Sequence, residues 1–346
     1  LSQWRRGVPL GRVPSAIPRP SGKSSVSDFI FSVNATLPIF LTMLLGTLLR
    51  RAGVMDEPFT DYLNAFVFRV ALPTLLFMDL AGQDFASAWD GRFVLFCLAT
   101  TLVSIVLIAA ASLVFVRDAP RRGEFVQVSY RSSAAILGLA FIQNIYGTGD
   151  AGMASLMILG SVPLYNVVAV VVLTLTAPGE RGGRPEAVPL LRRAGHGIVT
   201  NPIILGIVAG FAWSLLRLPC PELLFSTVHN VGVLATPLGL MAMGASFCPE
   251  RAKGDVPAAL AASVIKLVLL VAAFMPLAVW AGFRDQQLVA LLVMLGSAST
   301  VSCFVMAKNM GHEGTLTSTV VMMTTFGCAA TLTLWLWLLK SLALVG

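Results

Sequence analysis

The chain has 346 residues, of which 56% are apolar and only 12% are charged, and its mean hydropathy is +0.83. A soluble domain of this length carries about twice that share of charged residues. The composition therefore excludes an ordinary soluble enzyme or binding domain and indicates a membrane protein. The apolar runs are continuous, which favours spanning helices over the alternating pattern of barrel strands.

The net charge of +7 does not indicate a nucleic-acid partner, because the basic residues lie in short loops and in the N-terminal tail, where membrane topology accounts for them. The five cysteines have no paired or metal-ligand spacing, and the three histidines form no HExxH or similar pair. We therefore expect no cofactor and no metal site. Since the spans contain no His/Asp/Glu cluster, we also expect no catalytic residues and a protein that is not an enzyme.

Residues 1–27 are rich in Arg, Pro and Ser, and we expect them to form a disordered basic tail. Residues 177–197 are rich in Gly, Pro and Arg and are predicted to form a linker. Ten apolar spans are predicted around this linker, at residues 29–49, 62–81, 93–116, 125–146, 153–176, 198–216, 226–247, 256–281, 286–307 and 315–339.

A single offset of about 164 positions relates the two halves of the chain, residues 28–176 and 198–346. It maps Pro38 onto Pro202, Gly46 onto Gly210, Pro73 onto Pro237, and Ser133-Ala134 onto Ser297-Ala298. Each half holds five spans, and an odd number makes the second half enter the membrane from the opposite side. The sequence therefore predicts a 5+5 inverted repeat, the plan of secondary transporters.

Lysines and arginines in short loops predict the orientation of the chain. Twelve of them lie on the side of the 177–197 linker and four on the other side, leaving the tail aside. We expect a multi-pass protein of a bacterial inner (plasma) membrane, with the linker cytoplasmic and both termini outside. The five basic residues of the tail conflict with this orientation.

Two corresponding spans, the fourth and the ninth, carry small and polar residues in their apolar runs. These are Ser132, Ser133 and Ala134 in one span, and Ser297, Ala298, Ser299 and Thr300 in the other. A helix broken in mid-membrane frees backbone groups, and the N-terminal ends of half-helices attract anions. Ordinary helix packing is the alternative, but the symmetric recurrence favours a substrate site formed by both spans.

Charged and amide side chains within spans are further candidates. Lys266 lies near the middle of the eighth span, where it would attract an anion, fix a cluster of carbonyls or serve a structural role. Asp79 is a candidate proton carrier, with a solvated helix end as the alternative. Arg131 and Lys308 are expected to snorkel to the cytoplasmic interface, although either could lie at the entrance to the substrate path. Asn144 and Asn166 are candidate substrate ligands, with helix packing as the default.

Short motifs in order along the chain point to a known family. They are Leu37-Pro38-Ile39-Phe40, Arg50-Arg51-Ala52-Gly53, Leu72-Pro73-Thr74-Leu75-Leu76-Phe77, Asn201-Pro202-Ile203-Ile204, Ala235-Thr236-Pro237-Leu238, Met243-Gly244-Ala245-Ser246 and Phe304-Val305-Met306-Ala307-Lys308. From about Phe31 to its end the chain resembles the auxin efflux carrier family, in particular its bacterial members of the malonate-transporter type.

The resemblance implies an all-α protein of ten transmembrane helices, in the architecture of NhaA-type antiporters and bile-acid transporters, with helices four and nine broken and crossing. It implies a scaffold of residues 28–81 and 198–247, through which a homodimer forms, and a moving transport domain of residues 92–176 and 256–341. The prolines that mark the crossing in plant members are absent here, which leaves the substrate open.

The sequence thus predicts a secondary transporter of small organic anions, such as malonate or auxin-like acids, that works among membrane lipids by elevator-type alternating access. One alternative is a sodium-coupled carrier of larger amphipathic anions. Another is a membrane sensor or lipid-binding module that does not transport. The direction of transport and the coupling ion, H+ or Na+, stay open.

Overall fold

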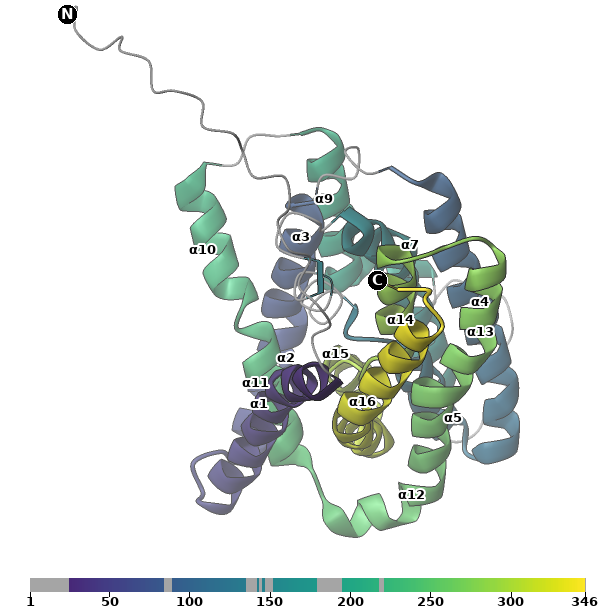
Figure 1. The fold of residues 1–346 in the computed structure, drawn as a ribbon. Helices are drawn as coiled ribbons and strands as arrows, with labels where there is room; N and C mark the ends of the chain where they lie inside the picture. Colours follow the sequence, from purple (N-terminus) through teal and green to yellow (C-terminus); the bar gives the residue numbers. More distant parts are fainter. Residues whose placement is uncertain are drawn as a thin grey trace, which may run out of the picture.

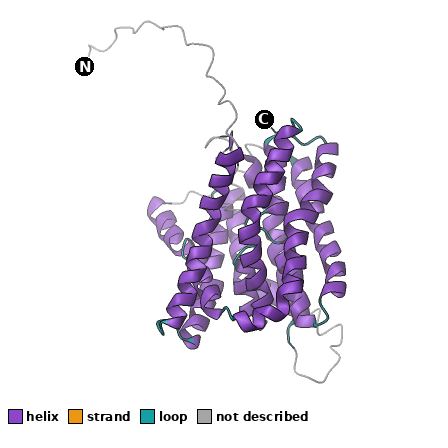
Figure 2. Ribbon diagram, turned by 60° about the horizontal axis from the view of Figure 1, so that its bottom comes forward, coloured by secondary structure: helices purple, strands orange, loops and turns teal. Residues whose placement is uncertain are grey.

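The protein is a bundle of helices packed side by side in a computed structural model (Figures 1 and 2). The structure describes residues 25–83, 89–134, 142, 145–146, 152–178, 195–217 and 221–345, with side chains from residue 37 onward. These residues contain no strand. The predicted tail lies almost wholly outside the described residues, and so does most of the predicted linker.

The helices fall on either side of the linker. Those before it are α1 (Ser25–Arg51), α2 (Glu57–Phe66), the π-helix η1 (Val67–Ala71), α3 (Leu72–Ala81), α4 (Gly91–Phe115), α5 (Ala119–Tyr130) and α7 (Gly152–Thr176). Those after it are α9 (Pro202–Leu215), α10 (Glu222–Gly232), α11 (Ala235–Ser246), α12 (Pro249–Val264), the π-helix η3 (Ile265–Leu269), α13 (Leu270–Trp280), α14 (Gln286–Gly296), α15 (Ser302–Asn309) and α16 (Thr315–Ser341).

Six helical stretches in the described part of the chain are long and apolar enough to cross a membrane. They are Glu57–Ala81, Gly91–Phe115, Gly152–Thr176, Glu222–Ser246, Pro249–Trp280 and Thr315–Ser341. The apolar helices α9 and α14 are shorter. These helices make the chain a polytopic membrane protein, whereas the count of ten spans and the 5+5 repeat stay predictions.

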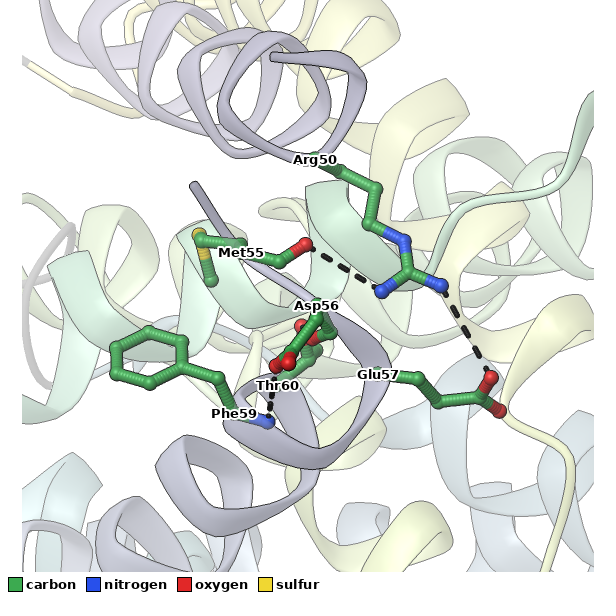
Figure 3. A network of polar contacts seen from close by, with 6 residues as sticks. All are labelled: Arg50, Met55, Asp56, Glu57, Phe59 and Thr60. Atoms are coloured by element: carbon green, nitrogen blue, oxygen red, sulfur yellow. Dashed lines mark hydrogen bonds and ion pairs between the residues drawn. The ribbon is translucent and has the colours of Figure 1, made fainter. Parts of the chain in front are cut away.

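The turn between α1 and α2 shows how a polar residue starts a helix (Figure 3). The Asp56 carboxylate accepts a hydrogen bond of 2.8 Å from the Phe59 backbone N–H and so caps α2. Arg50 donates to the Met55 carbonyl over 3.3 Å and pairs with Glu57 at 3.9 Å. Both side chains of that ion pair are exposed, so it contributes about 0–1 kcal/mol. The cap is therefore the main polar interaction that orders this turn.

Helices α1 and α11 pack closely, and so do α3 and α9. A Cβ atom on Gly46 would lie 2.2 Å from the Met241 carbonyl oxygen, and one on Gly210 would lie 2.5 Å from that of Phe77. The two contacts are counterparts under the offset of about 164 positions. Glycine lets the backbones of two membrane helices touch in this way. Gly206 makes the same kind of close backbone contact, with the Pro73 carbonyl of α3.

A second set of helices packs around α5 and joins residues from both halves of the chain. In it, α5 contacts α4, α7, α12 and α16. Buried Glu124 of α5 accepts hydrogen bonds of 2.9 and 3.0 Å from the backbone N–H groups of Gly314 and Thr317, so its carboxylate caps α16. Arg121 pairs with buried Asp255 of α12 at 3.3 Å. These contacts hold α5 to α12 and α16; the division into scaffold and transport domains remains a prediction.

The close helix pairs predict that Gly46→Ala and Gly210→Ala each lower the free energy of unfolding in detergent by about 1–3 kcal/mol, because the added methyl group overlaps a carbonyl of the facing helix. Gly254→Ala on α12 is the control, since nothing lies within 4 Å of its Cβ position. Equal unfolding free energies for the three variants would contradict the close packing.

Candidate functional site

Two helices are interrupted inside the bundle. Residues 131–133 are not helical after α5, and residues 297–300 are not helical after α14. The two interruptions contact each other, because the Ser133 backbone N–H donates a hydrogen bond of 3.0 Å to the Ala298 carbonyl. We call this region, residues 131–134 and 297–301, the crossing.

The backbone groups freed at the crossing find partners in the opposite segment or in neighbouring helices. Ser299 donates from its hydroxyl to the Val128 carbonyl (2.7 Å), and its N–H bonds the Thr324 hydroxyl (3.1 Å). The Gln127 amide donates to the Cys303 carbonyl over 2.9 Å. Irregular backbone at membrane depth persists where protein or a cavity satisfies it in this way.

A cavity of about 60 Å³ lies against the crossing. Its lining is Leu72, Leu75, Leu76, Asp79, Arg131, Ser132, Ser133, Ala134, Val162, Tyr165, Asn166, Thr236, Thr300, Val301 and Ser302. A water molecule needs roughly 10–15 Å³ measured in this way. The cavity therefore has room for a few waters or one small polar molecule, and its lining combines leucines and valines with polar and charged side chains.

Arg131 brings a positive charge to this cavity. The side chain is only 3% exposed, and its guanidinium donates to the Asn166 amide oxygen (2.8 Å) and the Ser302 hydroxyl (2.9 Å), with the Met306 sulfur at 2.8 Å. No described carboxylate pairs with it, and its Nε has no hydrogen-bond partner among the described residues. A buried cation without a counter-ion is costly, and an anion in the cavity would offset that cost.

The start of α15 adds to the positive potential. Thr300, Val301 and Ser302 line the cavity at the N-terminal end of this helix, where backbone N–H groups and the helix dipole favour negative charge. The guanidinium and this helix end both border the same small space. The arrangement suits a carboxylate, because the Arg131 Nε–H has no described partner and can donate to an anionic oxygen.

Asp79 lines the same cavity from α3. No ion pair joins its carboxylate to the Arg131 guanidinium among the described residues. A carboxylate and a guanidinium thus border one cavity without direct pairing, which leaves the guanidinium available to a ligand.

Several of the residues singled out in the sequence lie together at this cavity. They are Asp79, Ser132, Ser133, Ala134, Asn166 and Thr300. Three others, Ser297, Ala298 and Ser299, are buried at the crossing without lining the cavity. Lys266 is buried and also lies outside the lining, and Lys308 is half-buried near the end of α15. Asn144 lies outside the described residues.

The expectation that Arg131 snorkels to the interface is wrong. Its predicted span starts at residue 125, but α5 begins at Ala119, so Arg131 lies about 18 Å from the start of the helix and not about 9 Å. The charged residues at 121–124 suggest a loop before the span, but they belong to α5, and Glu124 is buried as the cap of α16. The polar lining residues that the sequence analysis missed are Tyr165, Thr236 and Ser302. Of these, Ser302 continues the small polar run at 297–300.

Comparison with known proteins identifies the family of the chain. Residues 31–336 match the profile of a family described as "Membrane transport protein". The chain belongs to this family. It is the auxin efflux carrier family that the sequence motifs resemble, and the protein is a membrane transporter.

Two relatives in this transporter family match over almost their whole length. A protein of Rhizobium meliloti named "Putative malonate transporter" is 28% identical, with 89% of this chain and 96% of the relative covered. An uncharacterized transporter of Methanocaldococcus jannaschii is 20% identical, with 89% and 98% covered.

The hydrogen bonds around Arg131 predict a role for Asn166 in orienting the guanidinium. Asn166→Ala should raise the dissociation constant for a small carboxylate about tenfold, because hydrogen bonds to charged groups contribute about 1.5–3 kcal/mol. Calorimetric titration of the purified protein with malonate measures this. Ser161→Ala on the same helix is the control, since its hydroxyl bonds the Met157 carbonyl of α7. Equal affinities of both variants would contradict the role.

Proposed function

We propose that the protein is a secondary transporter of small mono- or dicarboxylates, with malonate as the first candidate. The observation that carries this proposal is the buried guanidinium of Arg131, which borders a small cavity and forms no ion pair with a described carboxylate. The relative from Rhizobium meliloti, named as a malonate transporter, supports this class of substrate. One carboxylate would bind Arg131 and the start of α15.

The size of the cavity favours a small acid over a large amphipathic anion. Sites for drug-sized ligands have volumes of about 300–1,000 Å³, whereas this cavity has about 60 Å³. A compact acid with one or two carboxylates matches such a space. The sodium-coupled carrier of larger anions is therefore the less favoured reading.

The position of the cavity supports an elevator-type movement. Leu72 and Asp79 line it from α3, and Thr236 lines it from α11, which are helices of the proposed scaffold. The opposite wall comes from α5, α7 and α15 of the proposed transport domain, with Arg131 and Asn166. A substrate held at this boundary would change sides when one domain moves against the other. The counterpart glycine contacts of α1 with α11 and α3 with α9 support the inverted repeat on which such movement depends.

Two further parts of this proposal concern the setting of the transporter. We place it in a bacterial inner membrane with the 177–197 linker cytoplasmic and both termini outside. We assign the homodimer contact to the scaffold, where α10 lies at the edge of the bundle and exposes large apolar side chains such as Leu223, Leu224 and Phe225 (Figure 1). Crosslinking through single cysteines on α10 in native membranes tests this contact.

Asp79 is the group that we propose to couple a proton to transport. Its charge would repel a carboxylate bound in the same cavity, and a proton on Asp79 removes that repulsion. Binding of the substrate and of a proton would then favour each other, which is the basis of symport.

The substrate assignment predicts that Arg131→Gln raises the dissociation constant for malonate about 100-fold and abolishes uptake into proteoliposomes, because the variant lacks the cation at the cavity. Lys308→Gln removes an equal charge outside the lining and should bind malonate like the wild type. Unchanged affinity in Arg131→Gln would refute the assignment. Binding by the wild type without accumulation would instead favour the sensor reading.

The coupling assignment predicts that an inward proton gradient stimulates uptake by the wild type and has no effect on Asp79→Asn, whose side chain is permanently neutral. Exchange of labelled for unlabelled malonate without a gradient should persist in the variant. Asp61→Asn, which changes an exposed carboxylate on α2, is the control. A gradient response in Asp79→Asn equal to that of the wild type would exclude this residue as the proton carrier.

A further inference from the structure

Lys266 is a second buried cation at the crossing, where its ammonium bonds Ser132, a residue of the cavity lining. It belongs to the π-helix η3, which joins α12 to α13 in one continuous stretch. Its side chain is fully buried and does not line the cavity. Short π-helical turns of this kind often mark functional sites, because the extra residue redirects a side chain.

The ammonium of Lys266 is surrounded by oxygen acceptors. It donates to the Tyr130 carbonyl over 3.1 Å, to the Met294 carbonyl over 3.4 Å, and to the Ser132 hydroxyl. The Ser132 hydroxyl in turn donates to the Met294 carbonyl. All three ammonium protons therefore have partners, and no described carboxylate forms an ion pair with this lysine.

The two carbonyls come from the C-terminal ends of two different half-helices. Tyr130 is the last residue of α5, and Met294 lies in the last turn of α14. Helix C-termini carry partial negative charge, and here two of them converge on one point. In secondary transporters with broken helices, such carbonyls and helix ends coordinate coupling ions such as Na+.

We propose that the Lys266 ammonium is a resident cation that occupies the place of a coupling Na+ ion. It neutralises the two helix ends and holds the halves of the crossing together, so the site has no room or need for a free ion. The proposal has two consequences. The transport consequence is that uptake of the carboxylate proceeds without Na+, and it rests on the proposed function. The structural consequence is that removal of the side chain leaves an oxygen-lined site that a small monovalent cation can fill, and it is independent of the proposed function.

Thermal unfolding of the purified protein in detergent tests the structural consequence without any substrate. For Lys266→Ala, addition of 200 mM Na+, ammonium or methylammonium in place of choline should raise Tm by about 3 °C or more, since an ion bound to the native state alone stabilises it. The wild type and Lys308→Ala, which changes a lysine outside this cluster, should show no such difference between cations.

Uptake of malonate into proteoliposomes tests the transport consequence. The wild type should transport at equal rates in Na+ and in choline. Lys266→Ala should lose uptake at least tenfold in choline and recover a measurable part of it in Na+, ammonium or methylammonium. The two proposals can fail separately. If the wild type does not bind malonate but Tm of Lys266→Ala still responds to cations, the substrate proposal fails and the resident-cation proposal stands.

Two results would overturn the resident-cation proposal. One is wild-type uptake that requires Na+. The other is a folded Lys266→Ala whose Tm is the same in Na+, ammonium, methylammonium and choline. Where Lys266→Ala does not fold, Lys266→Ser, which also removes the ammonium and leaves space for an ion, takes its place in the thermal test. If neither variant folds, the wild type decides: uptake that requires Na+ overturns the resident-cation proposal, and uptake at equal rates in Na+ and choline supports it.

Discussion

The contact between the two interrupted helices is the constraint on which the rest of this structure depends. A helix that stops inside the bilayer leaves backbone groups without partners, and the cost is several kcal/mol for each unsatisfied group. Here the segment after α5 and the segment after α14 satisfy each other, with the Ser133 N–H on the Ala298 carbonyl as the direct link. The two interruptions are therefore linked directly through their main chains and form one unit.

The charges at this unit divide into two kinds. Lys266 faces the C-terminal ends of α5 and α14, and protein oxygens take all three of its protons. Arg131 faces the cavity, where its partners are a neutral amide, a hydroxyl and a thioether. The first cation is therefore internally compensated, whereas the second has unmet capacity for an anion. Because of this difference, we assign a structural role to Lys266 and a substrate-binding role to Arg131.

Much of this site could be predicted from residue types alone. The small residues at 132–134 and 297–300 break the apolar pattern, and Ser132, Ser133 and Thr300 do line the cavity. The pair Gly206 and Gly210 predicts close helix packing, and both glycines contact the main chain of α3. These features follow from local rules, because small side chains permit close approach wherever the helices lie.

The sequence left the positions of both cations open, although a cluster of carbonyls was one of the settings expected for Lys266, and its ammonium does bond two carbonyls. The depth of Arg131 depends on where α5 begins, and that start is hidden because Glu124 is buried only through its long-range contact with α16. The direction of Lys266 depends on the π-helical turn at 265–269, since one extra residue rotates the following helix face by about 100°. Both are tertiary effects without a pattern in the sequence.

The central claim is that a carboxylate binds between Arg131 and the start of α15. Its most direct test is an experimental structure with bromomalonate, whose bromine marks the ligand by anomalous scattering. The account predicts one bromine peak inside the cavity lined by Arg131 and Thr300, with a carboxylate within hydrogen-bond distance of the guanidinium. A peak at another place in the bundle, with the Arg131 cavity free of ligand, would contradict it.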